Sequence, residues 1–228
     1  MAKFYKVLAK GQRSCYGENH VWKVEKWYEV QGELIPCQNG FHFCRPENLL
    51  DWICEEIWEA EYEGEVIDSG NKLVARKARI TRQCVKWNER TARLFACDCA
   101  QDVAHLIPGL EVQRCIEVAR AYAFRAASYE ELITAQEAAW EATWEVACDD
   151  SGAAARNAIW SIAREPAWAA ARDTALAAAH AIACAIAKAE ASTAAWVAAR
   201  DAAWTAARKK QTKRLINLLS PKSEEVKK

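Results

Sequence analysis

The sequence predicts an α+β protein, in which a small N-terminal module of strands and short helices precedes an all-α bundle rich in alanine and tryptophan. Two observations predict this class. Residues 1 to about 85 are poor in alanine and alternate aromatic with charged residues, as half-exposed strands do. From about residue 88 the apolar residues follow a helical period, and residues 140–208 are dominated by alanine, the strongest helix former.

We expect three parts along the chain: an α+β module over residues 1–86, a helical bundle over 87–220 and a disordered charged tail over 221–228. Basic and acidic residues each number 31, so the formal net charge is zero and neither a polyanion nor an anionic membrane is favoured as partner. The first residues lack the apolar core of a signal peptide, and charges interrupt the alanine-rich region. We therefore expect a cytoplasmic protein with reduced cysteines.

The N-terminal module contains one clear hairpin and several weaker elements. We expect strands over residues 4–8 and 21–30, and a short helix over 47–57, which follows a proline. Residues 58–67 alternate apolar side chains with glutamates, and 73–82 carry basic residues that would lie across from them. Cross-strand ion pairing is therefore the default explanation of both charged rows.

Capping signals divide the second half into helices. We expect helices over residues 90–106 and 111–124, and a third that begins with a capping box of Ser128 and Glu131 and ends near residue 148. Further helix boundaries are expected at Asp150-Ser151-Gly152, at Pro166 and at Ser192-Thr193.

A four-residue spacing organises residues 140–208. We call every fourth position from 140 to 208 a lattice position. Most lattice positions are large or basic, and most positions between them are alanine. Because four does not match 3.6 residues per turn, each successive large side chain is rotated by about 40° and the row winds around the helix. We expect several shorter helices that share a core, in which the tryptophans supply most of the large buried area, on the order of 200 Å² for each enclosed indole.

Tryptophan and arginine recur at positions i and i+4, a spacing that allows guanidinium groups to stack on indoles. The default explanation is that these residues build and cover a helical core. The alternative is a binding face for a partner helix, a nucleotide or a nucleic acid. Interleaved acids argue against nucleic acid because they cancel the positive field that phosphates require. The candidate binding residues are Trp168, Arg172, Trp196, Arg200, Trp204 and Arg208.

Cys37, His42 and Cys44 lie close together in the sequence, and Cys15 lies upstream of them. Thiolates and imidazoles are the usual ligands of tetrahedral zinc, so these residues are the candidate metal ligands and zinc is the candidate cofactor. The sequence lacks the short-spaced Cys-x2-Cys pairs of common zinc folds. The alternative is a turn and a strand whose cysteines pack and whose histidine forms hydrogen bonds.

His42, Glu61 and Glu63 are the candidate catalytic residues. The alternating glutamates resemble the paired glutamates of ADP-ribosyltransferases, in which one polarises the ribose and another orients the acceptor. Acidic alternation is also common on surface strands. The sequence contains no phosphate loop, dinucleotide fingerprint or Gly-x-Ser-x-Gly. We therefore expect a protein without enzymatic activity, with action on NAD or a nucleotide through the N-terminal module as the alternative.

Two stretches resemble known families. The block Pro36-Cys-Gln-Asn-Gly-Phe-His-Phe-Cys-Arg-Pro46 resembles an uncharacterised N-terminal domain common in bacteriophage and prophage proteins. The segment 92–100, together with 115–122 and the alanine-rich helices, is similar to a family of predicted immunity proteins of polymorphic-toxin systems. Neither resemblance supplies a catalytic residue.

These resemblances imply a phage or prophage accessory protein in the host-cell cytoplasm. We expect it to bind and neutralise or sequester a toxin, a defence component or its small signal molecule. The expected partner is a protein or a small nucleotide-like ligand, and the chain itself is a further candidate partner in a homo-oligomer. A purely structural phage accessory protein is the remaining alternative.

Overall fold

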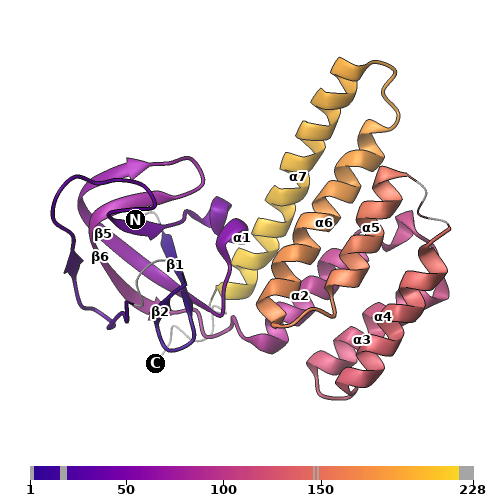
Figure 1. Cartoon of the computed structure of the whole chain (residues 1–228), viewed down its shortest axis with the longest axis horizontal. Coiled ribbons are helices and arrows are strands. Elements are labelled where there is room, and N and C mark those ends of the chain that lie inside the picture. The colour runs from indigo at the N-terminus through magenta and orange to yellow at the C-terminus, as the bar shows by residue number, and fades with distance from the viewer. Residues whose placement is uncertain (1–2, 16–19, 146, 148, 221–228) are drawn as a thin grey trace. The chain divides into compact units, whose positions relative to one another are not determined.

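The computed structural model describes residues 3–15, 20–145, 147 and 149–220. The chain forms two compact units, Met1–Asn88 with Arg214–Lys228 and Glu89–Lys213, which are described separately below. The predicted α+β class is confirmed, because an antiparallel sheet is followed by a series of helices (Figure 1). The expected tail over residues 221–228 lies outside the described residues.

The first unit is built on an antiparallel sheet. Its strands are β1 (Phe4–Ala9), β2 (Arg13–Ser14), β3 (Tyr28–Glu29), β4 (Phe41–Phe43), β5 (Glu56–Asp68) and β6 (Leu73–Gln83). The strand order is β2-β1-β5-β6-β3, and β4 also pairs with β6. Tyr5 and Cys44 exchange two backbone hydrogen bonds of 2.9 Å, which link the end of β4 to β1. The sheet therefore curls around a core.

Alternation along the strands fills this core. Trp58 and Ala60 of β5 are buried and Tyr62 packs against the cluster, so the predicted inward face of this strand is confirmed over these residues. Val66, which was predicted on the same face, is 37% exposed and lies beyond a register shift between Glu63 and Val66. The neighbouring strand, β6, contributes Ala78 and Ile80 to the same core. The other buried members are Leu8, Trp22, Phe43, Leu73 and Ala75.

The strand predicted over residues 21–30 is wrong for most of its length. Only β3 forms there, with an isolated bridge at Val21. The chain turns at Glu25, whose φ of 62° lies in the left-handed region. The amide of Glu25 then donates to the carbonyl of Ile80 at 2.8 Å. A tertiary hydrogen bond at this turn thus interrupts a segment whose side chains alternate as a strand would.

The helix predicted over residues 47–57 is also wrong beyond its first turns. A 3-10 turn, η1 (Pro46–Asn48), leads into the short helix α1 (Leu49–Trp52). Ile53 then takes a ψ of 138°, which ends the helix. Ile57 belongs to β5 instead and pairs with Val7 of β1.

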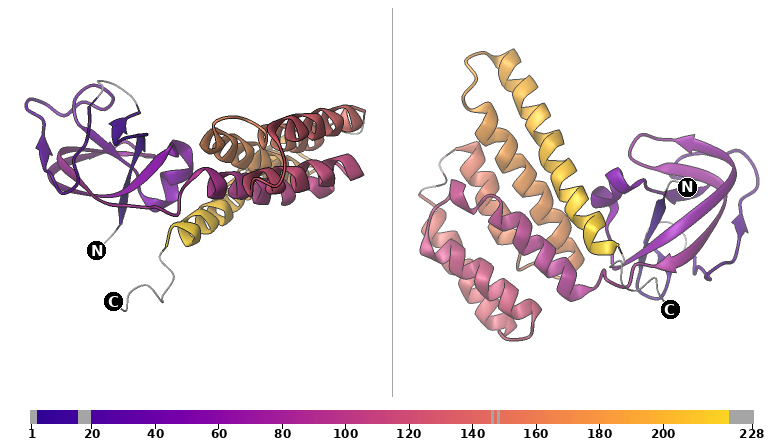
Figure 2. Two further views of the ribbon diagram at one scale, coloured as in Figure 1. Left: turned by 90° about the horizontal axis from the view of Figure 1, so that it is seen from below. Right: turned by 180° about the vertical axis from the view of Figure 1, so that it is seen from behind.

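The second unit contains the helices. They are α2 (Glu89–Gln101), the 3-10 turn η2 (Ala104–Leu106), α3 (Leu110–Ala123), α4 (Tyr129–Thr143), α5 (Asp150–Ser161), α6 (Ala167–Ala187) and α7 (Thr193–Leu219), the last turns of which fall in the first unit. The predicted helix starts near residues 150, 166 and 193 are confirmed. Helix α6 packs against both α5 and α2, and α3 packs on α4 (Figure 2). Within the described residues, no helix combines the length and apolarity that a membrane crossing requires.

Alanine fills the core of the helical unit, and the prediction of a tryptophan core is wrong. The lattice tryptophans, at positions 140, 144, 160, 168, 196 and 204, are all half-buried or exposed. Trp144 is 62% exposed and Trp160 is 40% exposed. In contrast, Ala170, Ala178 and Ala183 of α6 are fully buried. Methyl side chains let helix axes approach closely, and such an interface leaves no room for an indole.

Candidate functional site

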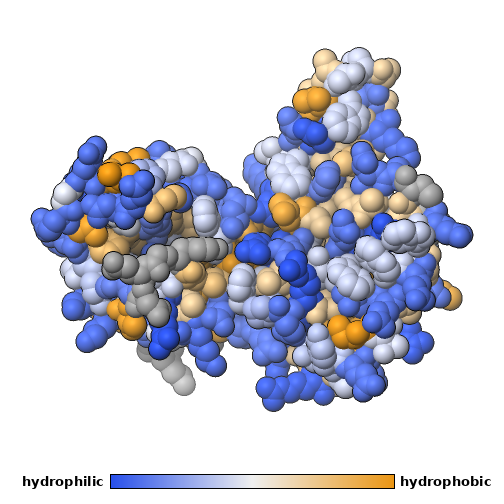
Figure 3. All heavy atoms as spheres, in the orientation of Figure 1, coloured by the Kyte–Doolittle hydropathy of each residue, from blue (hydrophilic) through white to orange (hydrophobic). Residues whose placement is uncertain are grey.

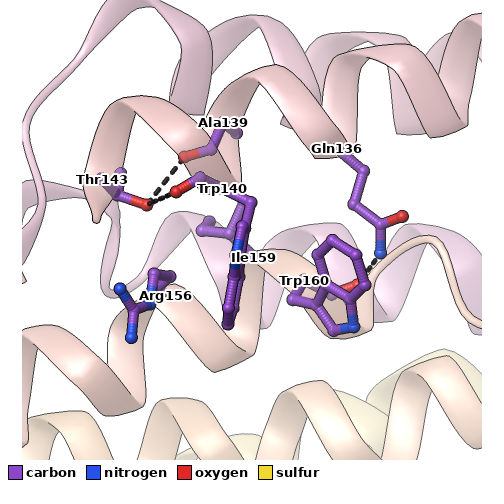
Figure 4. Close-up of a pocket in the computed structure, with 7 residues that line it drawn as sticks. All are labelled: Gln136, Ala139, Trp140, Thr143, Arg156, Ile159 and Trp160. Carbon is purple, nitrogen blue, oxygen red and sulfur yellow. Dashed lines mark hydrogen bonds between the residues drawn. The ribbon is translucent and has the colours of Figure 1, made fainter.

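A shallow recess lies between α4 and α5, and we call it the α4–α5 recess (Figure 4). It contains about 140 Å³ of empty volume, part of which is open to solvent. Helix α4 supplies Trp140 near its end, and α5 supplies Arg156 and Trp160, which are four residues apart and therefore share a face. Its lining residues are Gln136, Ala139, Trp140, Thr143, Arg156, Ile159 and Trp160.

Aromatic rings hold the guanidinium of Arg156. Its Cζ atom lies 4.5 Å from the ring centroid of Trp140 and 4.7 Å from that of Trp144. Trp160 lies on the other side of Trp140, with the two centroids 5.0 Å apart (Figure 4). The Nε atom of Arg156 is buried and makes no hydrogen bond within the described part of the chain. The indole faces therefore take the place of an acceptor.

Buried polar groups fix the backbone around the recess. The Nε2 atom of Gln136 donates a hydrogen bond of 2.5 Å to the carbonyl of Trp160, which ties α4 to the end of α5. The hydroxyl of Thr143 donates to the carbonyls of Ala139 and Trp140. Among the described residues that line the recess, Arg156 is the one that carries a charge, so its guanidinium dominates the electrostatics of this site.

The predicted stacking of arginine on tryptophan at i, i+4 is confirmed at two of the candidate pairs. Arg172 lies 5.4 Å from the ring of Trp168, and Arg200 lies 4.8 Å from that of Trp196. Unlike Arg156, both arginines also bond to the acid that follows them in the sequence, such as Asp173 beside Arg172. These pairs are therefore internally neutralised.

The remaining candidates on α7 have other contacts. The ring of Trp204 packs edge to face against His180 of α6, with centroids 6.5 Å apart. The guanidinium of Arg208 donates to the amide oxygen of Gln211 at 3.3 Å. The six predicted binding residues thus lie in separate local contacts, and none of them lines the α4–α5 recess.

Sequence reasoning missed Arg156 because its partners, Trp140 and Trp144, belong to a different helix. A signal was nevertheless present. Arg164, Arg172 and Arg200 are each followed by an acid, whereas Arg156 is followed by Asn157. Without a following acid, Arg156 is available for a contact with another helix, as is Arg208, which is followed by Lys209.

The surface around these residues is of mixed polarity. On the face shown in Figure 3, strongly hydrophobic residues are scattered among hydrophilic ones and do not form one patch.

The predicted ion pairing across the β5–β6 hairpin is confirmed. Glu61 accepts from Arg79 at 2.6 Å, and Glu63 accepts from Lys77 at 2.5 Å. Further along the same strands, Glu59 pairs with Arg82 and Glu65 with Arg76. The carboxylates of Glu61 and Glu63 are half-exposed and already paired with cations. Within the described residues neither forms a hydrogen bond or ion pair with His42, the third candidate catalytic residue.

The candidate metal ligands have separate hydrogen-bond partners. The Nε2 atom of His42 accepts from the amide of Cys37 at 3.0 Å, and burial lowers the pKa of His42 to about 4, so the ring is neutral. The Cys37 thiol accepts from Lys72 at 2.9 Å.

The other two cysteines lie deeper. Cys44 donates to the carbonyl of Tyr5, and burial raises the pKa of its thiol to about 12. A hydrogen bond with Cys54 raises the pKa of Cys15. Within the described part of the chain, no group of three or more histidine, cysteine or acidic side chains is placed to hold a metal ion.

The first unit is also the part of the chain that is similar to a known family. Residues 2–93 match the model of a domain of unknown function, DUF7666. The match covers the sheet and the first residues of α2, and the rest of the helical unit lies beyond it. A search of curated proteins found no match. A search of solved structures found none either.

The region matched by the DUF7666 model holds a buried lysine that the sequence did not reveal. Lys6 of β1 points into the core and is 8% exposed. Its amine donates to the carbonyl of His42 at 2.9 Å and lies 4.6 Å from the ring centroid of Trp22 and 5.4 Å from that of Phe43. Burial lowers the pKa of Lys6 to about 8.

Proposed function

We propose that the protein is a non-enzymatic interaction protein of the phage or prophage type. It binds a toxin, a defence component or its small signal molecule in the host-cell cytoplasm, and so neutralises or sequesters it. The observation that supports this proposal is the contact of Arg156 with Trp140 and Trp144, beside the exposed ring of Trp160. Tryptophan and arginine are the residues most enriched at the energetic centres of interfaces.

The energetics of the helical unit also favour binding. A buried indole stabilises a fold by several kcal/mol, on the order of 3–5 when it is lost from a core. The helical unit leaves its lattice indoles half-buried or exposed and packs alanines inside. Placing large aromatic side chains on the outside costs stability in the free protein, and a partner that covers them recovers that free energy.

Native mass spectrometry of the protein purified from cells that produce it tests the proposal. We expect the wild type to carry a partner protein, a small ligand or a second copy. The double variant Trp144→Ala/Trp160→Ala removes the two exposed indoles beside Arg156 and is expected to lose that partner. The control Phe124→Ala removes an exposed aromatic ring at the C-terminal end of α3, outside the recess, and is expected to retain the partner.

Two outcomes would contradict the proposal. One is a wild-type protein that carries no partner, ligand or second copy. The other is turnover of NAD or of a nucleotide that is lost in Glu61→Gln, which would support the enzymatic alternative. The ion pair between Glu61 and Arg79 speaks against that alternative, because the carboxylate is already engaged by a cation of its own chain.

A further inference from the structure

The indoles beside the α4–α5 recess already bind one guanidinium and have surface left for another. Arg156 contacts the rings of Trp140 and Trp144. Trp144 nevertheless remains 62% exposed, and Trp160 remains 40% exposed. An indole has two faces, and each attracts a cation that lies within about 6 Å of the ring centroid. The open indole surface is therefore suited to a cation from outside the chain.

Carboxylates lie directly beside these rings. Helix α4 contains Glu130, Glu131, Glu137 and Glu141 and no lysine or arginine. Glu137 precedes Trp140 by three residues and Glu141 precedes Trp144 by three, a spacing that makes them neighbours on the helix surface. Both glutamates are exposed, and neither forms an ion pair within the residues that the structure describes. A cation on Trp144 would find a counter-charge one turn away.

The charge balance also decides which ligands do not fit. Arg156 is the only basic residue on α4 or α5, and its Nε atom is buried against the indoles. Glu137 and Glu141 would repel a phosphate or an acidic peptide, and the partly enclosed Arg156 is the one cation on these helices that would attract it. Among cations, the planar guanidinium of arginine can stack on a ring and donate to a carboxylate at once, whereas a lysine ammonium is more strongly hydrated.

We propose that Trp144, Trp160, Glu137 and Glu141 bind arginine side chains from a basic segment of a partner protein. This inference rests on the proposed function and gives the partner its chemistry. An incoming guanidinium stacks on the part of the Trp144 ring that Arg156 leaves exposed, and it pairs with Glu141. We call these four residues the arginine-binding surface.

Isothermal titration calorimetry with short synthetic peptides tests this surface on the full chain. The first probe is a peptide in which arginines alternate with glycines. Matched peptides carry lysine or glutamate in place of arginine, and ATP serves as the nucleotide. We expect the arginine peptide to bind several-fold more tightly than the lysine peptide, and the glutamate peptide and ATP to bind more weakly than either.

Variants locate the binding. We expect the affinity for the arginine peptide to fall about ten-fold in Trp144→Ala and likewise in the double variant Glu137→Gln/Glu141→Gln. This factor corresponds to the loss of one partly desolvated cation–π contact or ion pair. The control Glu117→Gln/Glu190→Gln removes the same charge from exposed positions on α3 and after α6, and is expected to leave the affinity unchanged. The replaced side chains are exposed, and circular dichroism checks that each variant keeps its helices.

Three results would overturn the inference: equal affinity for the arginine and lysine peptides, equal weakening by the control pair, or tighter binding of the glutamate peptide or ATP. The proposed function fails separately. If Trp144→Ala/Trp160→Ala loses its co-purified partner while the arginine peptide does not bind the wild type, the partner is recognised by other chemistry and the proposed function stands. If the wild type has no partner, the proposed function is wrong whatever the peptide does.

Discussion

Lys6 shows how a single residue can take a role that its sequence neighbours conceal. It lies with Phe4 and Leu8 on the inward face of β1, although a lysine in an alternating strand predicts a solvent-facing position. Two aromatic rings and one carbonyl surround its amine. Burial of a cation without a carboxylate partner disfavours the charged form, and this is the physical reason for its lowered pKa.

The lowered pKa of Lys6 predicts how stability changes with pH. Its pKa is about 8 in the folded protein and 10.5 ordinarily, so between these values the unfolded chain binds more protons than the folded one. Stability from this residue therefore rises as the pH rises from about 8 to about 10.5. Relative to Lys6→Met, the wild type is expected to gain about 1–3 kcal/mol of unfolding free energy between pH 7 and pH 10. Urea denaturation at a series of pH values measures the difference.

Cysteine and tyrosine titrations occur in both proteins and cancel in that comparison. The control Lys10→Met replaces an exposed lysine that follows β1, and it is expected to show the same pH profile as the wild type. A constant difference between wild type and Lys6→Met across the pH range would show that Lys6 titrates normally.

Helix boundaries were the most predictable feature at the scale of the element. The capping box of Ser128 and Glu131 forms as predicted, with the Ser128 hydroxyl accepting from the Glu131 amide at 3.1 Å. The start of α5 was also predicted, although its cap is Asp149, which accepts from the amide of Gly152 at 2.7 Å. These signals are readable because a cap depends on residues within one turn of each other.

Gly152 of α5 provides a test of this helix start. At an open helical site, replacing glycine by alanine stabilises a helix by about 1 kcal/mol. Here a Cβ atom would lie 2.9 Å from the Cα atom of Ala147, which is backbone and cannot rotate away. We expect Gly152→Ala to destabilise the protein by about 1–3 kcal/mol instead. Thermal denaturation followed by circular dichroism measures the sign.

Asn157→Ala, at an exposed site on the same helix, is the control and is expected to be neutral or slightly stabilising. A stabilised Gly152→Ala variant would mean that the chain before α5 relaxes without cost.

The segments that failed prediction depend on contacts between distant residues. The alternation of residues 21–30 is a sound strand pattern, but the turn at Glu25 is fixed by Ile80 of β6. The contact of Arg156 with Trp140 and Trp144 was missed for the same reason, since it joins two helices. A pattern within one segment carries no information about which other segment will pack against it.

At the scale of the molecule, the main departure from the prediction is that small side chains fill the interior of the helical unit and large ones lie toward its surface. The lattice was predicted correctly as helical and broken, but its large residues were expected inside. Alanines form the buried face of α6, while Trp168 on the same helix is half-buried beside Arg172. Hydrophobicity alone favours a buried indole. The close spacing of alanine-lined helices excludes it, and this spacing cannot be derived from one helix at a time.

An alanine core predicts an unusual response to substitution. Ala178 of α6 is fully buried, and Ala178→Leu adds volume where helices are in close contact. We expect this variant to lose about 1–3 kcal/mol of unfolding free energy, or more if the helices must separate. The control Ala206→Leu makes the same change at an exposed position on α7 and is expected to lie within about 0.5 kcal/mol of the wild type.

Chemical denaturation of both variants measures the difference. Equal stability of Ala178→Leu and Ala206→Leu would show that the interior has room for larger side chains and that the helices are not as tightly packed as the buried alanines indicate.

The alanine interior also separates two tasks that most folds combine. In an ordinary bundle the same aromatic residues both hold the helices together and shape whatever part of them reaches solvent, so a change of specificity disturbs the scaffold. Here the tryptophans of the lattice are half-buried or exposed and lie outside the alanine interior. Substitutions at positions such as Trp144 or Trp160 would change the surface of the helical unit and leave the packing of its methyl-lined interior unchanged.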